Sequence, residues 1–339
     1  MRPRATGNGE QGTGSREQGI GDRERGTGRG RASLAPGPRP PNPSAKRHRT
    51  RVAWALAFLL PGLTLYSVLI LYPTMQSLVY STQDWQGRTA RFVGLSNFAE
   101  LLHDRLVWVG AFNNLRVLAL ILVFQLPIAL TLAYMLSRKQ GVAGFFRFVY
   151  FIPGLVGAAT MALMWGFIYQ RDHGILNGVL EAVGLGSLIR HWLSADGVVQ
   201  WSVAVPGVYA GVGFFVIIFM AAISDISESI YEAASIDGAS AWQQLVHITL
   251  PSIRGVYLMA CVLGVTDALS AFVFPFILTQ GGPLHRTETL TSYAVWQSFQ
   301  NYRRGYGAAI AVFHFAIAVV ATLIIRRIAR REQEVSKAL

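Results

Sequence analysis

Six long apolar segments are the strongest constraint on what this chain of 339 residues can fold into. Each is close to the length of about 20 mostly apolar residues that an α-helix needs to cross the hydrocarbon core of a bilayer. As core helices of a water-soluble protein, six such segments would be hard to cover with so few polar residues. They lie at 52–72, 117–136, 148–169, 198–223, 256–278 and 308–325. The sequence therefore predicts an all-α integral membrane protein with six transmembrane helices.

The composition agrees with a membrane protein that has no catalytic site of its own. Charged residues make up only 14% of the chain, whereas soluble domains carry about 25%. The single cysteine, Cys261, excludes an internal disulfide. Glycine precedes none of the three lysines, Lys46, Lys139 and Lys337, so the chain has no phosphate-binding loop of the Gly-Lys type. We find no metal-ligand cluster and no catalytic motif, and we predict no enzyme activity.

Residues 1–45 form a basic tail that is rich in glycine, arginine and proline. A pattern of seven residues recurs between positions 10 and 30, as EQGTGSR, EQGIGDR and ERGTGRG. The tail has too few apolar side chains to offset its ordering entropy, so we expect it to be disordered. Arg/Gly tracts can bind nucleic acid or anionic lipid, but such tails are more often solvated, and we predict no nucleic-acid partner. The repeat also favours a start of translation downstream of Met1.

The distribution of lysine and arginine predicts the orientation in the membrane. With the N-terminus inside, the inner segments carry 21 of the 30 Lys and Arg residues, and the outer segments carry 9. Without residues 1–45 the inner segments still carry 13. Both termini are therefore expected in the cytoplasm, on either side of a six-span domain at 46–331 with a short tail at 332–339.

The inner loop at 224–254 departs from this distribution, because it carries four acidic residues and a single arginine. Two Ser-x-x-Glu/Gln patterns, at 229–232 and 240–243, fit helix capping boxes. Gly238 between them supplies a turn, since glycine adopts positive φ without strain. Pro251 is expected to open the fifth span, where its missing N–H has no cost. The loop should therefore form a compact helix–turn–helix on the cytoplasmic face.

This loop resembles the EAA motif of the permease subunits of binding-protein-dependent ABC importers. The residues that carry the resemblance, at the spacing of that motif, are Glu232, Ala233, Ala234, Gly238, Ile248, Leu250 and Pro251. Shorter motifs resemble the carbohydrate-uptake branch, of the maltose and glycerol-3-phosphate type. They are GLSNF at 94–98, GFFR at 144–147, FIP at 151–153, GILN at 174–177, LTQGGP at 278–283 and GYGAA at 305–309. The resemblance covers about 51–331, and it departs from the family at Pro275, where relatives often carry an acid.

The resemblance implies a type I ABC importer permease fold in which the loop is a coupling helix, seated in a groove of a separate ATP-binding subunit. Glu232 and Asp237 would then pair with basic residues of that partner. Helix capping by Glu232 and a plain turn at Asp237 are the alternative roles.

The resemblance also implies several partners and a location. The partners are an ATPase dimer that binds ATP and Mg, an extracytoplasmic solute-binding protein and a second permease subunit, which makes a heterodimer. One chain supplies a single coupling loop, whereas an ATPase dimer presents two grooves. The chain itself needs no cofactor, and its implied location is the bacterial cytoplasmic (inner) membrane.

Five residues within the spans are candidates for the substrate path: Asp267, Gln125, Trp165, Tyr209 and Phe272. An acid near the middle of a span costs about 2.5–3.5 kcal/mol on insertion scales, so it normally faces a cavity or a partner. The alternative for Asp267 is an anchor between helices, paired with His314. The amide can join helices by hydrogen bonds, and the aromatic rings can serve ordinary packing.

Three functions remain open at this point. The leading one is import of a sugar or sugar-like solute by alternating access, driven by ATP on a separate subunit. The alternative is an ion-coupled secondary transporter that uses Asp267, although such transporters usually carry several charges within the membrane. A membrane scaffold is a third, but it leaves the polar loop without a purpose. Asn113 and Asn114, at the outer end of the second span, are expected to cap interfacial groups.

Overall fold

A computed structural model describes residues 54, 57–87, 89–138 and 140–338, of which 140–143, 147 and 328–338 are described by their backbone alone. The tail predicted to be disordered, at 1–45, and the basic cluster at 46–51 lie outside the described residues. The chain divides into two units, Met1–Gly62 and Leu63–Leu339. In the first unit the described residues are helical, and the contacts described below all lie within the second.

Six apolar crossings are present, as predicted, but the third is broken. Along the chain the elements are η1 (Ser67–Leu71), α2 (Tyr72–Tyr80), β1 (Gln83–Trp85), β2 (Ala90–Phe92), α3 (Ser96–His103), α4 (Arg105–Leu120), η2 (Ile121–Gln125), α5 (Leu126–Ser137), α6 (Gln140–Leu155), α7 (Ala158–Ile168), α8 (Ile175–Ala182), η3 (Gly186–Leu188), α9 (Val199–Ser224), α10 (Glu228–Ile236), α11 (Ala241–Gln244), η4 (Leu245–Thr249), α12 (Leu250–Ser252), α13 (Arg254–Leu269), α14 (Val273–Thr279), α15 (Leu290–Val295), η5 (Trp296–Gln300) and α16 (Arg304–Ala338). η3 is a 3-10 turn and the other η elements are π-turns. Five helices are long and apolar enough to span a bilayer: Ala57–Tyr80, Arg105–Ser137, Val199–Ser224, Arg254–Thr279 and Arg304–Arg327. The predicted third crossing is instead a pair of helices, α6 and α7, whose axes meet at 96°.

The second crossing is one continuous helix, α4–η2–α5, and it begins at Arg105 rather than at the predicted 117. Its start is fixed by Asp104, whose side chain accepts the Leu106 N–H at 2.8 Å. The helix includes the polar residues before 117 because their side chains find partners on neighbouring elements. The length of the apolar segment alone therefore underestimates the length of this helix.

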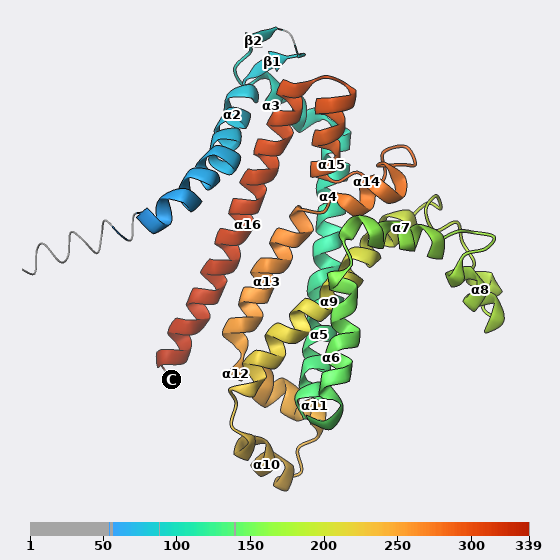
Figure 1. Cartoon of the computed structure of the whole chain (residues 1–339), viewed down its shortest axis with the longest axis vertical. Coiled ribbons are helices and arrows are strands. Elements are labelled where there is room, and N and C mark those ends of the chain that lie inside the picture. Colours follow the sequence, from blue (N-terminus) through green and yellow to red (C-terminus); the bar gives the residue numbers. More distant parts are fainter. Residues whose placement is uncertain (1–53, 55–56, 88, 139, 339) are drawn as a thin grey trace, which may run out of the picture. The chain divides into compact units, whose positions relative to one another are not determined.

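The main core lies between α5 and α9, which pack along each other with α6 against α9 (Figure 1). Ala129 and Ala133 of α5 are fully buried in this core, together with Phe215 and Phe219 of α9. Small residues let helix backbones approach closely in a membrane. Gly213 has the same role, because a Cβ there would collide with the Tyr150 backbone of α6. This core holds the inner half of the unit together.

The outer half is joined by the amide side chains of the second crossing. Asn114 donates to the Ala268 carbonyl, near the end of α13, at 2.7 Å, and accepts the Leu290 N–H, at the start of α15, at 3.1 Å. Asn113 donates to two carbonyls of the loop before α15. Helix ends leave such backbone groups without intrahelical partners. The predicted capping role is confirmed for Asn114, which joins α4 to the end of α13 and the start of α15, whereas Asn113 bonds to a loop.

Asp104 is a second junction at the outer end. Its carboxylate accepts hydrogen bonds from the hydroxyls of Tyr293 and Tyr306, each at 2.7 Å. Burial, together with the bond to Asp104, raises the pKa of Tyr293 well above its usual value, so this hydroxyl stays a donor. Beside it, Arg303 forms a two-pronged ion pair with Glu100, at 2.8 and 2.6 Å. These contacts fix α16 to the α3–α4 corner.

A small hairpin, β1–β2, is the part of the fold that the all-α prediction missed. Its strands pair antiparallel, with Asp84 opposite Arg91. Each strand has only three residues, too few to show an alternating pattern in the sequence. Asn97 fastens the hairpin by donating to the carbonyls of Ser81 and Gln83, each at 2.9 Å.

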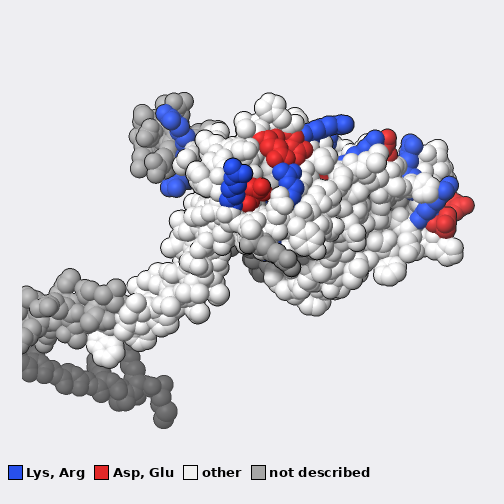
Figure 2. Space-filling view, turned by 90° about the horizontal axis from the view of Figure 1, so that it is seen from above, with Lys and Arg blue, Asp and Glu red and all other residues white. Residues whose placement is uncertain are grey.

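Charged side chains of both signs gather in groups in the view from above, and broad uncharged areas lie between and below them (Figure 2). Several large apolar side chains of the crossings are exposed, among them Phe124, Ile128, Ile217 and Val320. On helices that cross a bilayer, such side chains contact lipid. The flanks of the unit are therefore its membrane-facing surface.

We predict that Asn114→Leu lowers the stability of the folded chain in detergent by about 2 kcal/mol or more. The substitution leaves a buried carbonyl and a buried N–H without partners, and each such loss costs about 1–3 kcal/mol. The measurement is the thermal midpoint of the monodisperse peak in fluorescence-detected size exclusion. Gln300→Leu, at an exposed position, is the control and should leave the midpoint in place. An unchanged midpoint in Asn114→Leu would contradict the assigned role.

Candidate functional site

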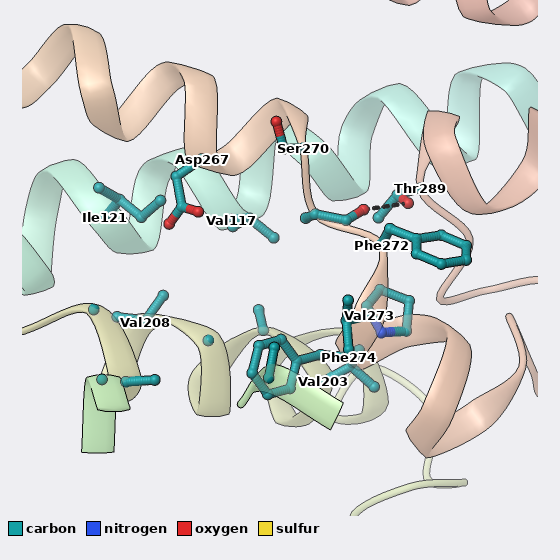
Figure 3. A pocket seen from close by; sticks show the side chains of 18 of the residues that line it. Val117, Ile121, Val203, Val208, Asp267, Ser270, Phe272, Val273, Phe274 and Thr289 are labelled. Carbon is teal, nitrogen blue, oxygen red and sulfur yellow. Dashed lines mark hydrogen bonds between the residues drawn. The ribbon is translucent and has the colours of Figure 1, made fainter. Parts of the chain in front are cut away.

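A cavity of about 720 Å³ lies where two membrane helices are interrupted (Figure 3). One interruption is the bend between α6 and α7, at Gly157, whose extended backbone begins the new helix. The other separates α13 from α14, at Ser270–Phe272. α4 and α9 supply the remaining walls. Irregular backbone at membrane depth is tolerated where it lines a cavity or is buried in protein, and broken helices often form transporter binding sites.

The cavity is mostly apolar, with a few polar groups on its walls. Its polar side chains, apart from one acid, are Asn113, Gln200, Thr266, Ser270, Thr287 and Thr289. Thr289 is already engaged, because its hydroxyl donates to the Ala271 carbonyl at 2.6 Å. Phenylalanine rings from α9 and from the α13–α14 break face the same space. Apolar walls with a few fixed polar groups are typical of a small-molecule site.

Asp267 and Phe272 are the two predicted substrate-path residues that line this cavity. The Asp267 carboxylate points into it beside Val117 and Ile121 (Figure 3). Phe272 stacks on Phe276 with ring centroids 5.0 Å apart. The suggested pairing of Asp267 with His314 is wrong, because His314 contacts the Thr291 hydroxyl at 3.2 Å instead.

Trp165 and Tyr209 are not among the residues that line the cavity. Their rings meet edge to face at 5.9 Å, and Trp165 also packs on Tyr169 at 5.1 Å. This is the ordinary packing role that was the alternative for aromatic residues. Trp192 adds a third aromatic contact, because its ring stacks on that of Tyr169 with the centroids 6.2 Å apart.

Gln125 lies at the end of η2 and is completely buried. Its amide was expected to join helices through hydrogen bonds, but neither polar atom has a partner among the described residues. The side chain packs against Gly211 of α9, where any Cβ would collide with it. The π-turn and the glycine together make room for this amide beside the cavity wall.

The second candidate site is the loop between α9 and α13, which we call the knob (Ser224–Arg254). Helix α10 ends at Ile236, and Gly238, two residues further on, has a φ of +79°. The N–H groups of Gly238 and Ala239 bond back to the carbonyls of Ser235 and Ala234, closing the helix end. The capping box of Ser240 and Gln243 is present at the start of α11. The predicted helix–turn–helix is confirmed.

Two predicted details of the knob are wrong. α10 begins at Glu228 with Ser227 as its cap residue, so Ser229 lies inside the helix and forms no capping box with Glu232. Pro251 does not open the fifth span, since it lies in α12 and the chain breaks after it, at Ile253. The helix of α11 therefore continues through η4 and α12, and no intramolecular role remains assigned to the Glu232 carboxylate.

The outward surface of the knob combines small, acidic and apolar residues. On α10, Tyr231 is buried, and the helical period places Ser229, Glu232, Ala233 and Ile236 on the opposite side. Ile236 is 86% exposed, although it is a large apolar residue. Trp242 of α11 is 67% exposed. Sequence reasoning missed both, and their signal was an apolar residue inside a polar loop.

Buried polar side chains fix the knob to the second crossing. The Tyr134 hydroxyl of α5 donates to Gln244 Oε1 at 2.9 Å, and Gln244 Nε2 donates to the Ser235 hydroxyl at 3.0 Å. The hydroxyls of Tyr231 and Thr249 lie 2.9 Å apart. Ile248 and Leu250 of the motif pack against the core and do not face outward. The knob is therefore held rigidly against α5.

Metal binding has no support in the part of the chain that the structure describes, where no group of three His, Cys, Asp or Glu side chains could hold an ion.

We predict that Tyr134→Phe loosens the knob without unfolding the chain. The change leaves Gln244 Oε1 without its donor, which costs about 1–2 kcal/mol and corresponds to roughly 5–30-fold faster opening. Hydrogen–deuterium exchange of peptides over 228–250 measures this rate. Tyr302→Phe, at an exposed tyrosine, serves as the control. Equal exchange in both variants would show that the hydroxyl does not hold the knob.

Comparison with known proteins identifies the family. Residues 125–334 match the family described as binding-protein-dependent transport system inner membrane component. A probable ABC transporter permease protein of Bacillus subtilis, YurN, is 32% identical over 79% of this chain and 92% of its own length. The diacetylchitobiose uptake system permease protein NgcF of Streptomyces coelicolor is 31% identical, over 83% of this chain and 86% of its own.

A solved structure has the same fold. It is a bacterial ABC transporter involved in the import of the acidic polysaccharide alginate, matched with a TM-score of 0.74 and 21% identity over 85% of this chain and 99% of that one. The chain therefore belongs to the family of inner membrane components of binding-protein-dependent transport systems, as a non-catalytic permease subunit of an ABC transporter.

Proposed function

We propose that this permease moves a sugar or sugar-like solute into the cytoplasm by alternating access, driven by ATP on a separate subunit. The name of the relative NgcF, a diacetylchitobiose permease, supports a carbohydrate. The cavity supports it too, since phenylalanine rings beside hydroxyl and amide groups suit a solute with apolar C–H faces and polar edges. Asp267 and Phe272 contact the solute in this proposal.

The observation that carries the proposal is the knob, a rigid helix–turn–helix whose outward surface has no assigned role among the described residues. Ile236 and Trp242 are large, apolar and exposed, and such residues are typical anchors of protein interfaces. Ala233 allows a close approach of the partner backbone. Glu232 and Asp237 meet basic residues of the partner. We assign this surface to an ATP-binding subunit, which holds the ATP and Mg.

Movement of the knob has a direct route to the cavity. Gln244 and Tyr134 connect it to α5, and α5 continues through η2 into α4; Ile121 of η2 and Val117 of α4 line the cavity. On the other side, η4 and α12 lead into α13, which carries Asp267. Gly238 and Ala234 keep the turn compact, while Ile248, Leu250 and Pro251 connect the knob to the core and to the fifth crossing. Closure of the ATPases would shift two cavity walls together.

The remaining partners complete the transporter. A second, similar permease is needed because this chain brings one knob to an ATPase dimer. A solute-binding protein outside the membrane would deliver the solute. The excess of Lys and Arg on the inner segments supports a cytoplasmic knob and cytoplasmic termini. Ion coupling is less well supported, because Asp267 is the one acid within the six crossings of the sequence.

A photo-crosslinking experiment tests the assignment of the knob. Ile236→Cys, in a chain with Cys261→Ser, is labelled with a thiol-reactive photo-crosslinker in the purified transporter. We expect a product with an ATP-binding subunit whose yield changes when ATP is added. Leu188→Cys, an exposed position in the loop between α7 and α9, is the matched control and should give no such product. A transporter that moves solute with no ATPase subunit attached would overturn the proposal.

We also predict that Ile236→Asp separates the ATPase from an otherwise intact permease. Placing a carboxylate in the centre of an apolar contact should cost at least about 2 kcal/mol, the size of an interface hot spot, or roughly 30-fold in affinity. The readouts are the amount of ATPase that co-purifies and the rate of solute uptake. Because Ile236 is exposed, the thermal midpoint of the chain should not change. Leu188→Asp, which should leave both readouts at the wild-type level, is the control.

A further inference from the structure

We propose that the cavity selects solutes by charge: it admits uncharged and cationic solutes and repels anions, and Asp267 is the residue that imposes this selection. The inference deepens the proposed function, on which it rests, because it takes the cavity as the solute path. It narrows the class of sugar to neutral sugars and amino sugars. Sugar acids and sugar phosphates are excluded.

The charge on the cavity wall has a single source. Among the described residues that line the cavity, Asp267 is the one charged side chain, and Lys, Arg and His are absent. The other polar groups of the wall are amides and hydroxyls, which accept and donate hydrogen bonds without carrying charge. An anionic solute would therefore meet a carboxylate and find no cation to pair with.

Three other ionisable groups, Arg116, Glu288 and His285, lie near the second crossing and the loop before α15, and none of them lines the cavity. Arg116 is held at the outer end, because its guanidinium donates to Asn113 Oδ1. Glu288 is buried, and its carboxylate accepts from the hydroxyl of Ser292 and contacts His285 at 3.1 Å. Asn113 is itself bonded to the loop that precedes α15. All three groups are thus engaged at the rim.

Asp267 lies deeper than this rim. Its carboxylate points into the cavity beside Val117 and Ile121, which follow Asn113 by one and two turns of the second crossing. Each turn of an α-helix rises about 5.4 Å. The carboxylate therefore acts on a solute in the body of the cavity, while the Arg116 guanidinium is bonded to Asn113 and does not line the cavity. Apolar walls concentrate the field of such a charge, since they screen it poorly.

The surroundings of Asp267 also suit a cation. Its immediate neighbours on the wall are apolar or hydroxyl-bearing, and Phe272 and Phe274 present rings to the same space. The faces of aromatic rings attract ammonium groups. A protonated amine in the cavity would be attracted by the Asp267 carboxylate, whereas the carboxylate of a sugar acid would be repelled by it and would find no cation on the wall.

Charged thiol reagents test the selection without knowledge of the solute. Ser270→Cys, with Cys261→Ser, places a thiol on the cavity wall one helical turn from Asp267. The purified transporter is treated with methanethiosulfonates that carry a trimethylammonium, a sulfonate or no charge. We expect the ratio of the cationic to the anionic rate to exceed that of a free thiol in solution by at least about tenfold, the low end of electrostatic focusing in a cleft.

The matched control keeps the thiol and removes the charge. With Asp267→Asn in the same chain, the ratio should return to that of the free thiol, while the uncharged reagent reacts as before. With Arg116→Gln, the cationic preference should persist or increase. A preference that appears only in Arg116→Gln would mean that Arg116 cancels the carboxylate, and it would overturn the proposal.

Two further outcomes would also overturn it: equal relative rates for the two charged reagents, or a thiol that no reagent reaches. The experiment needs neither ATP nor a binding protein. Its failure would therefore leave the crosslinking result on the knob unaffected, and a failure of the knob assignment would leave these rates unaffected.

Discussion

Hydrocarbon offers no hydrogen bonds, so every backbone group that a membrane helix releases must find a partner within the protein. This chain interrupts two of its crossings and must satisfy the ends that result. Asn114 performs this role at the outer interruption, by bonding to the end of α13 and the start of α15 together. The cavity exists because α13 can stop at Leu269 without leaving its last carbonyls unpaired. The position of Asp267, within the last turn of that helix, follows from the same contact.

The two candidate sites depend on each other through one helix. The crossing Arg105–Ser137 carries cavity-lining residues in its outer part and Tyr134 in its inner part. The Tyr134 hydroxyl donates a hydrogen bond to Gln244 of the knob, so a tilt of the knob would displace this helix. The proposed coupling to an ATPase needs such a rigid connection, and buried polar contacts supply one here. The apolar core around Ala129 and Phe219 keeps that connection stiff.

The sequence predicted the features that are repeated or local. Each apolar segment is a continuous stretch of the sequence. The turn at Gly238 and the capping box at Ser240 each depend on residues a few positions apart. It could not predict the features that depend on distant partners. Helix α4 includes Asn113, Asn114 and Arg116, which a hydropathy pattern assigns to a loop, because their partners lie more than 150 positions away or on the adjacent turn. The broken third crossing and the short hairpin were missed for similar reasons, since a bend at Gly157 and strands of three residues are tertiary outcomes.

The π-turn η2 has a consequence for the phase of the second crossing. A π-turn holds one residue more than an α-helical turn, and one residue corresponds to about 100° of rotation around a helix axis. The residues before η2 face the cavity, and those after it, Ala129 and Tyr134, face α9 and the knob. Loss of a single residue from Ile121–Gln125 would convert the π-turn into an α-helical turn and leave the two halves in nearly the same phase. Loss of a residue from α4 or α5 would instead rotate one half against the other by about 100°. A deletion within the π-turn should therefore keep the cavity and the knob in register, and a deletion on either side of it should not.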